Sequence, residues 1–129
     1  EIGCGLFSMK SFDDLVEIAK RKNLFDEKNP WSNGSSTYLE EIQKELHEVI
    51  EELPKNRKNY LEDELGDVLW DYLNLVLALE DEAGIELSNV LKRASSKYNE
   101  RISGIENGIL WKEIKEKQKT ALAKEEKES

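Results

Sequence analysis

The spacing of apolar residues predicts helices along almost the whole chain. The first is predicted from Ser11, a suitable N-cap, to about residue 23. Its core-facing positions are Phe12, Leu15, Val16, Ile18 and Ala19. The next segment, DEKNPWSNGSS at residues 26–36, contains a proline, an Asn-Gly pair and three serines. These residues favour turns, so we predict a loop there with one aromatic side chain, Trp31, in its middle.

Two longer helices follow this loop. One covers Thr37–Leu53, begins at a threonine N-cap and is ended by Pro54. Its predicted core stripe is Leu39, Ile42, Leu46, Val49, Ile50 and Leu53, flanked by an acidic stripe of Glu41, Glu45, Glu48 and Glu52. The basic loop KNRKN leads to the other helix, Tyr60–Ala83, with Gly84 as its C-cap. Its second half is apolar almost all the way round, which is expected of a helix surrounded by others.

A shorter amphipathic helix is predicted from Ser88. Its apolar stripe consists of Leu87, Val90, Leu91, Ala94, Tyr98 and Ile102. Gly104 and Gly108 are predicted to break this helix. Residues 112–129 are dominated by Lys and Glu, and we interpret this charged C-terminal tail as either a solvated helix or a disordered segment.

The helical segments form one predicted domain over residues 9–111. Residues 1–8 precede a Met9-Lys10 pair that would make a natural start, so we interpret them as a disordered lead-in or a cloning remnant. Helices of this length with modest connections predict an all-α fold, an antiparallel bundle of four helices. One of these helices is apolar on too many sides for three short partners to cover, so we expect oligomerisation to complete the bundle.

Composition and charge argue against several classes of protein. The chain has 129 residues, enough for one domain, with 38% hydrophobic and 36% charged residues. No apolar run reaches the roughly 18 residues that a membrane span needs, so no membrane partner is expected. A net charge of -9 disfavours nucleic acid as a partner, because its phosphates need a basic surface. A single cysteine, Cys4, and no visible secretory signal favour a reducing, cytoplasmic location.

Two pairs of acidic residues are candidates for a metal site: Glu45 with Glu48, and Glu64 with Asp67. Residues three apart on a helix have Cβ atoms about 5–6 Å apart, so each pair can direct its oxygens to one small volume. Taken alone, Glu45 and Glu48 fit a solvated acidic edge better than a site. Glu64, Asp67 and Asp71, however, share one side of a largely apolar helix, where an unpaired carboxylate is costly to bury.

A hard divalent cation would relieve the repulsion between these carboxylates. All the candidate ligands are oxygens, no cysteine lies nearby, and the single histidine, His47, is predicted on a polar face, so Mg²⁺ or Mn²⁺ fits better than Zn²⁺. The Glu-x-x-His motifs of di-iron bundles are absent from the sequence. The pattern therefore favours a magnesium site, with Mn²⁺ as a substitute.

Two cations, Lys97 and Arg101, lie four residues apart on the helix predicted from Ser88 and project near its apolar stripe. On this helix alone, snorkelling over the edge of the core and phosphate binding are equally good interpretations. Beside a carboxylate-bound metal, phosphate binding becomes the better one. The metal bridges carboxylate and phosphate oxygens, while Lys and Arg hold the remaining anionic oxygens.

These motifs resemble the MazG-type all-α nucleotide pyrophosphohydrolases, whose signature is a Glu-x-x-Glu pair followed by Glu-x-x-Asp. The matching text is EIQKELHEVIEEL and LEDELGDVLWDYLNLV, with further likeness at Pro30-Trp31 and in LKRASSKYNER. The resemblance spans about Asn23 to Arg101. It implies Mg²⁺-dependent hydrolysis of a nucleoside triphosphate to a monophosphate and pyrophosphate, with housecleaning of non-canonical nucleotides as one role. It also implies a homodimer or homotetramer.

The resemblance also assigns roles to individual residues. The implied metal ligands and catalytic residues are Glu45, Glu48, Glu64 and Asp67, one of them a candidate for deprotonating the attacking water. Lys97 and Arg101 would contact phosphates. Trp31 either stacks on a base or covers the core, and Asn74 either contacts a base or sugar or bonds to a neighbouring helix. Asp71 is a candidate outer-shell ligand.

Two alternatives remain open at the level of sequence. Enzymes of the same all-α superfamily, dUTPase-like or phosphoribosyl-ATP pyrophosphohydrolases, would use similar carboxylates on other substrates. A non-enzymatic helical interaction module would instead use the acidic residues as a binding edge and would need no metal.

Overall fold

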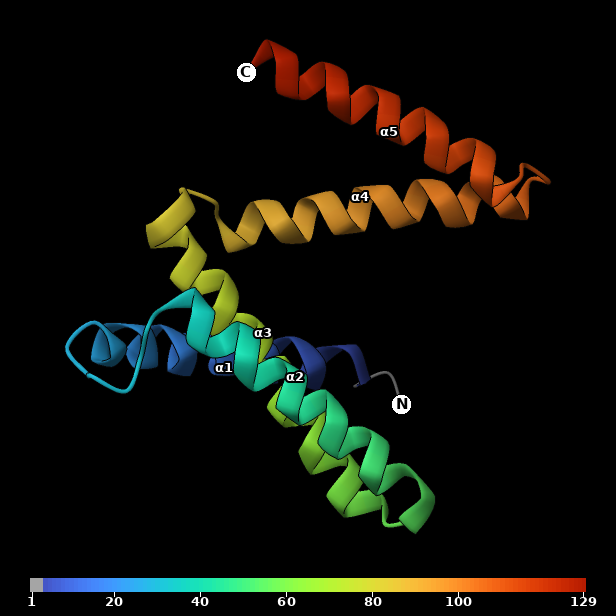
Figure 1. Ribbon diagram of the computed structural model, residues 1–129. Coiled ribbons are helices and arrows are strands. Elements are labelled where there is room, and N and C mark those ends of the chain that lie inside the picture. The colour runs from blue at the N-terminus through green and yellow to red at the C-terminus, as the bar shows by residue number, and fades with distance from the viewer. Residues whose placement is uncertain (1–3) are drawn as a thin grey trace. The chain divides into compact units, whose positions relative to one another are not determined.

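The computed structural model describes residues 4–129, with side chains from Lys10 onward, and this part of the chain is entirely helical. It contains five α-helices, one short 3₁₀ turn and no strand, so the predicted all-α fold is confirmed for the described residues (Figure 1). The chain forms two compact units, one ending at Leu87 and one beginning at Ser88. None of the described helices is long and apolar enough to cross a membrane.

The first unit consists of three helices and a 3₁₀ turn. Helix α1 spans Cys4–Asp26, α2 spans Ser35–Glu52, the 3₁₀ turn η1 spans Leu53–Lys55 and α3 spans Lys58–Ala83. Helix α2 packs along α3, and α1 packs against α3 as well (Figure 1). The apolar side chains buried in this unit are those of Ala19, Tyr38, Leu73, Val76, Leu77, Ala78 and Leu87, with four of them supplied by the second half of α3.

Each of the four predicted helices starts earlier in the structure, α3 by two residues at Lys58 and the helix predicted from Ser88 by one at Leu87. Helix α1 begins at Cys4 rather than Ser11, because adding a residue to an existing helix costs little. Residues 4–8 of the predicted lead-in are therefore helical, whereas residues 1–3 lie outside the described part. Helix α2 begins at Ser35, two residues before the predicted cap Thr37, whose hydroxyl instead accepts a hydrogen bond from the Asn33 amide.

The start of α2 is capped from a distant part of the chain. The Glu82 carboxylate, near the end of α3, accepts hydrogen bonds from the Ser35 backbone amide at 2.8 Å and from the Ser35 hydroxyl at 2.5 Å. Gly34 makes this approach possible, because a Cβ there would lie 2.3 Å from the Glu82 carboxylate and its φ is +70°. At this same end of α3, Gly84 adopts the left-handed conformation of a C-cap, as predicted.

The surface that α2 turns toward α3 is more acidic than predicted. The buried and half-buried positions of α2 include a series spaced four and three residues apart: Tyr38, Ile42, Glu45, Val49 and Glu52. On α3 the matching positions are Glu64, Asp67, Asp71, Asn74 and Ala78. This spacing is that of two helices packed side by side. Acidic side chains therefore occupy much of the α2/α3 seam.

The predicted apolar stripe of α2 was wrong as a description of its packed face. Leu46, Ile50 and Leu53 are 48%, 63% and 55% exposed, while Ile42 and Val49 are half-buried. One extensively packed neighbour covers only part of a helix's circumference, so a second apolar edge remains uncovered. The sequence pattern could not distinguish the edge that faces α3 from the edge beside it.

The second unit is a helical hairpin. Helix α4 spans Leu87–Glu106, α5 spans Trp111–Glu128, and the turn between them contains Gly108 with φ +83°. Of the two forms predicted for the charged tail, the structure has the helix. The prediction that Gly104 breaks α4 was wrong. Gly104 stays helical and lets the Ile114 side chain approach, because a Cβ on Gly104 would lie 2.2 Å from Ile114 Cδ1.

Candidate metal centre

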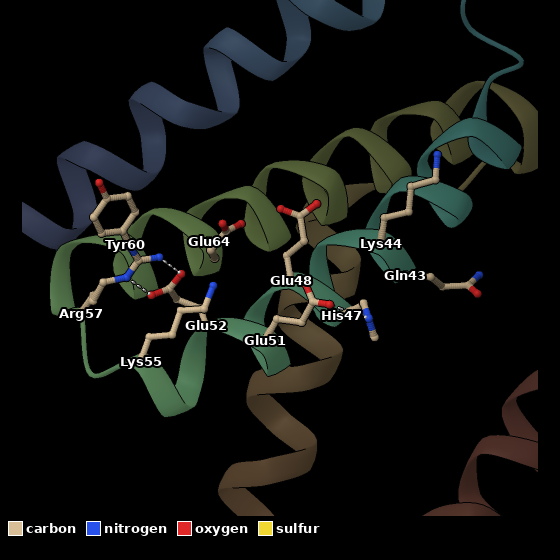
Figure 2. Close-up of a pocket in the computed structure, with 10 residues that line it drawn as sticks. All are labelled: Gln43, Lys44, His47, Glu48, Glu51, Glu52, Lys55, Arg57, Tyr60 and Glu64. Atoms are coloured by element: carbon tan, nitrogen blue, oxygen red, sulfur yellow. Dashed lines mark hydrogen bonds and ion pairs between the residues drawn. The ribbon is translucent and has the colours of Figure 1, made fainter.

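Three carboxylates converge between α2 and α3. Glu45 and Glu48 stand three residues apart on α2, and Glu64 stands near the start of α3. One oxygen from each lies within 4.8 Å of the others. Glu45 and Glu64 are half-buried, and Glu48 is exposed. Figure 2 shows Glu48 and Glu64 directed into the same cleft from the two helices.

The proximity of these groups raises their proton affinity. Burial, followed by the charges of Glu48, Asp67, Asp71 and Glu64, raises the pKa of Glu45 to about 7. Burial and then Glu48 and Asp67 also raise the pKa of Glu64. The Glu64 Oε1 atom is buried and has no hydrogen-bond partner among the described residues. A buried, unpartnered carboxylate oxygen next to two further carboxylates is the environment that a divalent cation relieves.

Asp67 lies one turn further along α3 and is not part of the group of three. Its side chain is half-buried, and burial followed by the charges of Asp63 and Glu48 raises its pKa. The structure thus brings together three of the four ligands expected from the sequence. Asp67 lies near enough to affect the titration of Glu45. Its role as a ligand stays a prediction.

Two further acceptors lie deeper in the seam. Asp71 is 6% exposed, its Oδ2 has no partner among the described residues, and burial followed by the charges of Glu41 and Asp67 raises its pKa to about 6. Asn74 is 1% exposed and donates from Nδ2 to the Trp70 carbonyl at 2.9 Å, within the same helix rather than to a neighbouring one. Its Oδ1 is buried and unpartnered as well.

Trp31 packs at the edge of a polar network in the first unit. Its ring is 51% exposed and meets Tyr38 edge-on, with ring centroids 6.0 Å apart. The Lys22 ammonium lies 4.5 Å from the Trp31 ring centroid and donates a hydrogen bond to the Tyr38 hydroxyl at 3.0 Å. Tyr38 in turn donates to Asp26, which also pairs with Lys22. No local sequence pattern revealed this network, because its members come from α1, from α2 and from the loop between these two helices.

Lys97 and Arg101 belong to the second unit, where their environments differ. Lys97 is exposed. Arg101 is 7% exposed, lies 5.2 Å from the Tyr98 ring centroid and 5.1 Å from that of Trp111, and donates from Nε to Gln118 Oε1 at 2.7 Å. The helical spacing did not reveal that α5 would hold Arg101 in place.

An open cleft lies beside the carboxylates, at the turn between α2 and α3. Its volume is about 750 Å³ (Figure 2). It is lined by Gln43, Lys44, His47, Glu48, Glu51, Glu52, Lys55, Arg57, Tyr60 and Glu64. Glu48 and Glu64 therefore belong both to the group of three carboxylates and to the cleft wall. In the sequence, the basic loop KNRKN was the only sign of the cations Lys55 and Arg57 that line this cleft.

A comparison with known protein families shows which family the chain is related to. The profile of the MazG nucleotide pyrophosphohydrolase domain matches residues 33–104, more than half of the chain. The chain belongs to this family. The matched segment of the MazG domain contains all the expected site residues except Trp31, which lies just before it. No curated protein and no solved structure gives a significant match.

Membership in the MazG family supports a nucleotide pyrophosphohydrolase, which is a hydrolase. The family is metal-dependent in general, and the described residues provide a cluster that fits a hard metal ion. The donors are carboxylate oxygens, and one of them is buried without a partner. Oxygen-only donor sets suit Mg²⁺ and Mn²⁺ rather than softer metals.

Proposed function

We propose that this MazG domain hydrolyses nucleoside triphosphates to nucleoside monophosphates and pyrophosphate, with Mg²⁺ or Mn²⁺ held by Glu45, Glu48, Glu64 and Asp67. The convergence of Glu45, Glu48 and Glu64 from two helices is the observation that carries the proposal. An ordinary acidic surface would let these carboxylates spread apart in solvent. Asp67 is included because it lies one turn beyond Glu64 and interacts with the same charges.

The bound metal would neutralise phosphate charge and lower the pKa of a bound water, so the protein needs no nucleophile of its own. The carboxylates fix the position of the reaction, and one of them accepts a proton from the attacking water. Lys97 and Arg101 hold phosphate oxygens, for which a long flexible ammonium and a planar guanidinium are both suited. Their position inside the family match supports this assignment.

Trp31 and Asn74 are the residues we propose for contact with the nucleoside. Half of the Trp31 surface is exposed, which leaves a ring face for stacking on a base. The unpartnered Oδ1 of Asn74 supports its assignment, because a base or sugar donor would satisfy this acceptor.

We further propose that a homodimer or homotetramer completes a four-helix bundle, with the functional domain at residues 9–111 and the charged segment at residues 112–129 outside it. The exposed apolar edge of α2 supports an oligomer, since water-exposed Leu46, Ile50 and Leu53 favour burial against another copy. The sequence supports a cytoplasmic location through its single cysteine.

A panel of canonical and altered nucleoside triphosphates, assayed for pyrophosphate release with Mg²⁺, tests the function. We expect pyrophosphate and the matching monophosphate from at least one of them, and none without a divalent ion. Activity confined to dUTP, or to phosphoribosyl-ATP, would place the protein with those related enzymes. A folded protein inactive on every substrate, with or without metal, would favour the non-enzymatic interaction module.

A further inference from the structure

The cleft of Figure 2 is lined by both acidic and basic side chains. Glu48 and Glu64 occupy one side, where the metal is proposed. Lys55, the last residue of η1, and Arg57, which precedes α3, come from the turn between the two helices. The proposed function uses Glu48 and Glu64 and leaves these two cations without a role.

Arg57 is fixed by neighbours of its own. Its Nε and Nη2 each donate to the Glu52 carboxylate at 2.8 Å, and its guanidinium lies 4.0 Å from the Tyr60 ring centroid. Glu52 is 5% exposed, and the hydrogen bonds from Arg57 hold its pKa below the usual value, so the pair stays charged. The pair therefore stabilises the turn that carries Lys55, and its charges largely cancel.

Lys55 differs from the other cations of the cleft. Lys44 pairs with Glu41 at 3.2 Å, and His47 lies 3.2 Å from Glu51. Lys55 forms no salt bridge with any side chain that the structure describes. Figure 2 shows its ammonium group turned toward Glu52 and the middle of the cleft. Among the described cations that line the cleft, Lys55 is therefore the one whose ammonium group is available to a ligand.

The charge of the cleft depends on the metal. Its lining has four carboxylates, from Glu48, Glu51, Glu52 and Glu64, against three Lys and Arg side chains, from Lys44, Lys55 and Arg57. Without a divalent ion the cleft is slightly negative, and with one it becomes positive. An anion that enters next to the metal therefore meets Lys55 at the far side of the same open space.

We propose that this cleft is the subsite for the diphosphate end of the substrate, and for the pyrophosphate product, with Lys55 as its binding residue. The inference rests on the proposed function, because it places the leaving diphosphate next to Glu48 and Glu64. A diphosphate has several charged oxygens, so it can contact the metal and an ammonium group together. Lys55 is thereby a phosphate-binding residue in the same unit as the carboxylates.

Calorimetric titration of inorganic pyrophosphate into the full chain with Mg²⁺ tests the subsite. We expect Lys55→Ala to weaken binding by about tenfold, as for loss of one charge-assisted contact, and Lys55→Arg to restore most of it. Lys58→Ala is the matched control, because Lys58 is an exposed lysine three residues away that does not line the cleft. Equal binding by the Lys55→Ala and Lys58→Ala variants would overturn the inference.

Turnover separates this inference from the proposed function. If the wild type releases pyrophosphate, the Lys55→Ala variant should have a raised KM for triphosphate and weaker inhibition by pyrophosphate, with kcat changed less. A wild type that hydrolyses triphosphate, paired with a Lys55→Ala variant as sensitive to pyrophosphate as the Lys58→Ala control, would overturn the subsite and leave the function standing. A wild type that hydrolyses nothing would overturn the function, irrespective of the calorimetry.

Discussion

Glu48 on α2 and Glu64 on α3 bring carboxylate oxygens to within 4.8 Å of each other, although 15 residues lie between them in the sequence. Two like charges at this distance repel, and Glu45 adds a third. The folded chain without metal therefore stores an electrostatic cost at the α2/α3 seam. That cost predicts how stability changes with pH and with metal.

We expect the metal-free protein to be more stable at pH 5.5 than at pH 8. In the folded chain the pKa of Glu45 is about 7 and that of Asp71 about 6, above their ordinary values of 4.5 and 3.8. The folded chain thus binds more protons than the unfolded chain between about pH 4 and 7, and the free energy of unfolding falls as pH rises through this range. Thermal denaturation with EDTA should give a Tm roughly 5 °C lower at pH 8.

Magnesium should remove most of this difference. Mg²⁺ binds the deprotonated carboxylates of the folded state, so it should raise the Tm at pH 8 and have little effect at pH 5.5. The Glu64→Gln variant is the control, since removing one charge should raise the metal-free Tm at pH 8 and weaken the response to Mg²⁺. A metal-free Tm that rises between pH 5.5 and pH 8 would contradict this account of the seam.

Metal affinity should depend on the converging carboxylates and not on their neighbours. Glu45→Gln should weaken Mn²⁺ binding by about tenfold or more, because a ligand oxygen loses its charge. Glu51→Gln provides the comparison, since Glu51 lines the same cleft on the same helix but lies outside the group of three. Calorimetry or Mn²⁺ electron paramagnetic resonance measures both. Equal losses in the two variants would mean that Mn²⁺ senses the general acidity of α2.

Lys97 and Arg101 should behave differently when truncated. Lys97→Ala is expected to lower kcat/KM at least tenfold at unchanged Tm, because Lys97 is exposed. Arg101→Ala should lower both activity and stability, the latter by about 1–2 kcal/mol, because it also loses its contacts with Tyr98, Trp111 and Gln118. Lys92→Ala, an exposed lysine on the same helix, should change neither quantity. Full activity in Lys97→Ala would remove that residue from the site.

The cap of α2 should matter for stability and little for chemistry. Glu82→Ala removes the acceptor for the Ser35 amide and hydroxyl, and we expect a loss of about 1 kcal/mol in the free energy of unfolding. Gly34→Ala should cost more, because a Cβ would collide with Glu82 and φ is positive. Glu86→Ala, an exposed acid beyond the end of α3, is the control. Urea denaturation measures all three, and no loss in Gly34→Ala would contradict this geometry.

The sequence predicted the helices well because their signals are local. These signals are the apolar periodicity along each helix, Pro54 after α2 and Gly84 after α3. It failed where a distant residue decides the outcome. Glu82 caps α2 from the far end of α3, so the local sequence could not reveal this cap and led us to predict Thr37 instead. Gly104 looked like a helix breaker, but Ile114 fills the space above it and the helix continues.

The sequence predicted part of the candidate metal site, as it did part of the fold. The three-residue spacing within each acidic pair predicted two small patches, and the packing of α2 on α3 brings Glu64 to Glu45 and Glu48. Spacing could not show that Asp67 would lie outside that group, since this depends on how the two helices cross. Nor could it show that Arg57 would pair with Glu52, because Arg57 comes from a turn whose path the sequence leaves open, while Glu52 ends α2.

The most direct test is Mg²⁺-dependent pyrophosphate release by the wild type, Glu48→Gln, Asp67→Asn and the matched Glu51→Gln variant, on the best substrate of the panel. We expect Glu48→Gln and Asp67→Asn to lose at least about a hundredfold in kcat/KM while remaining folded, and Glu51→Gln to stay within about threefold of the wild type. Near-normal rates in Glu48→Gln would contradict the central claim that the converging carboxylates hold the catalytic metal.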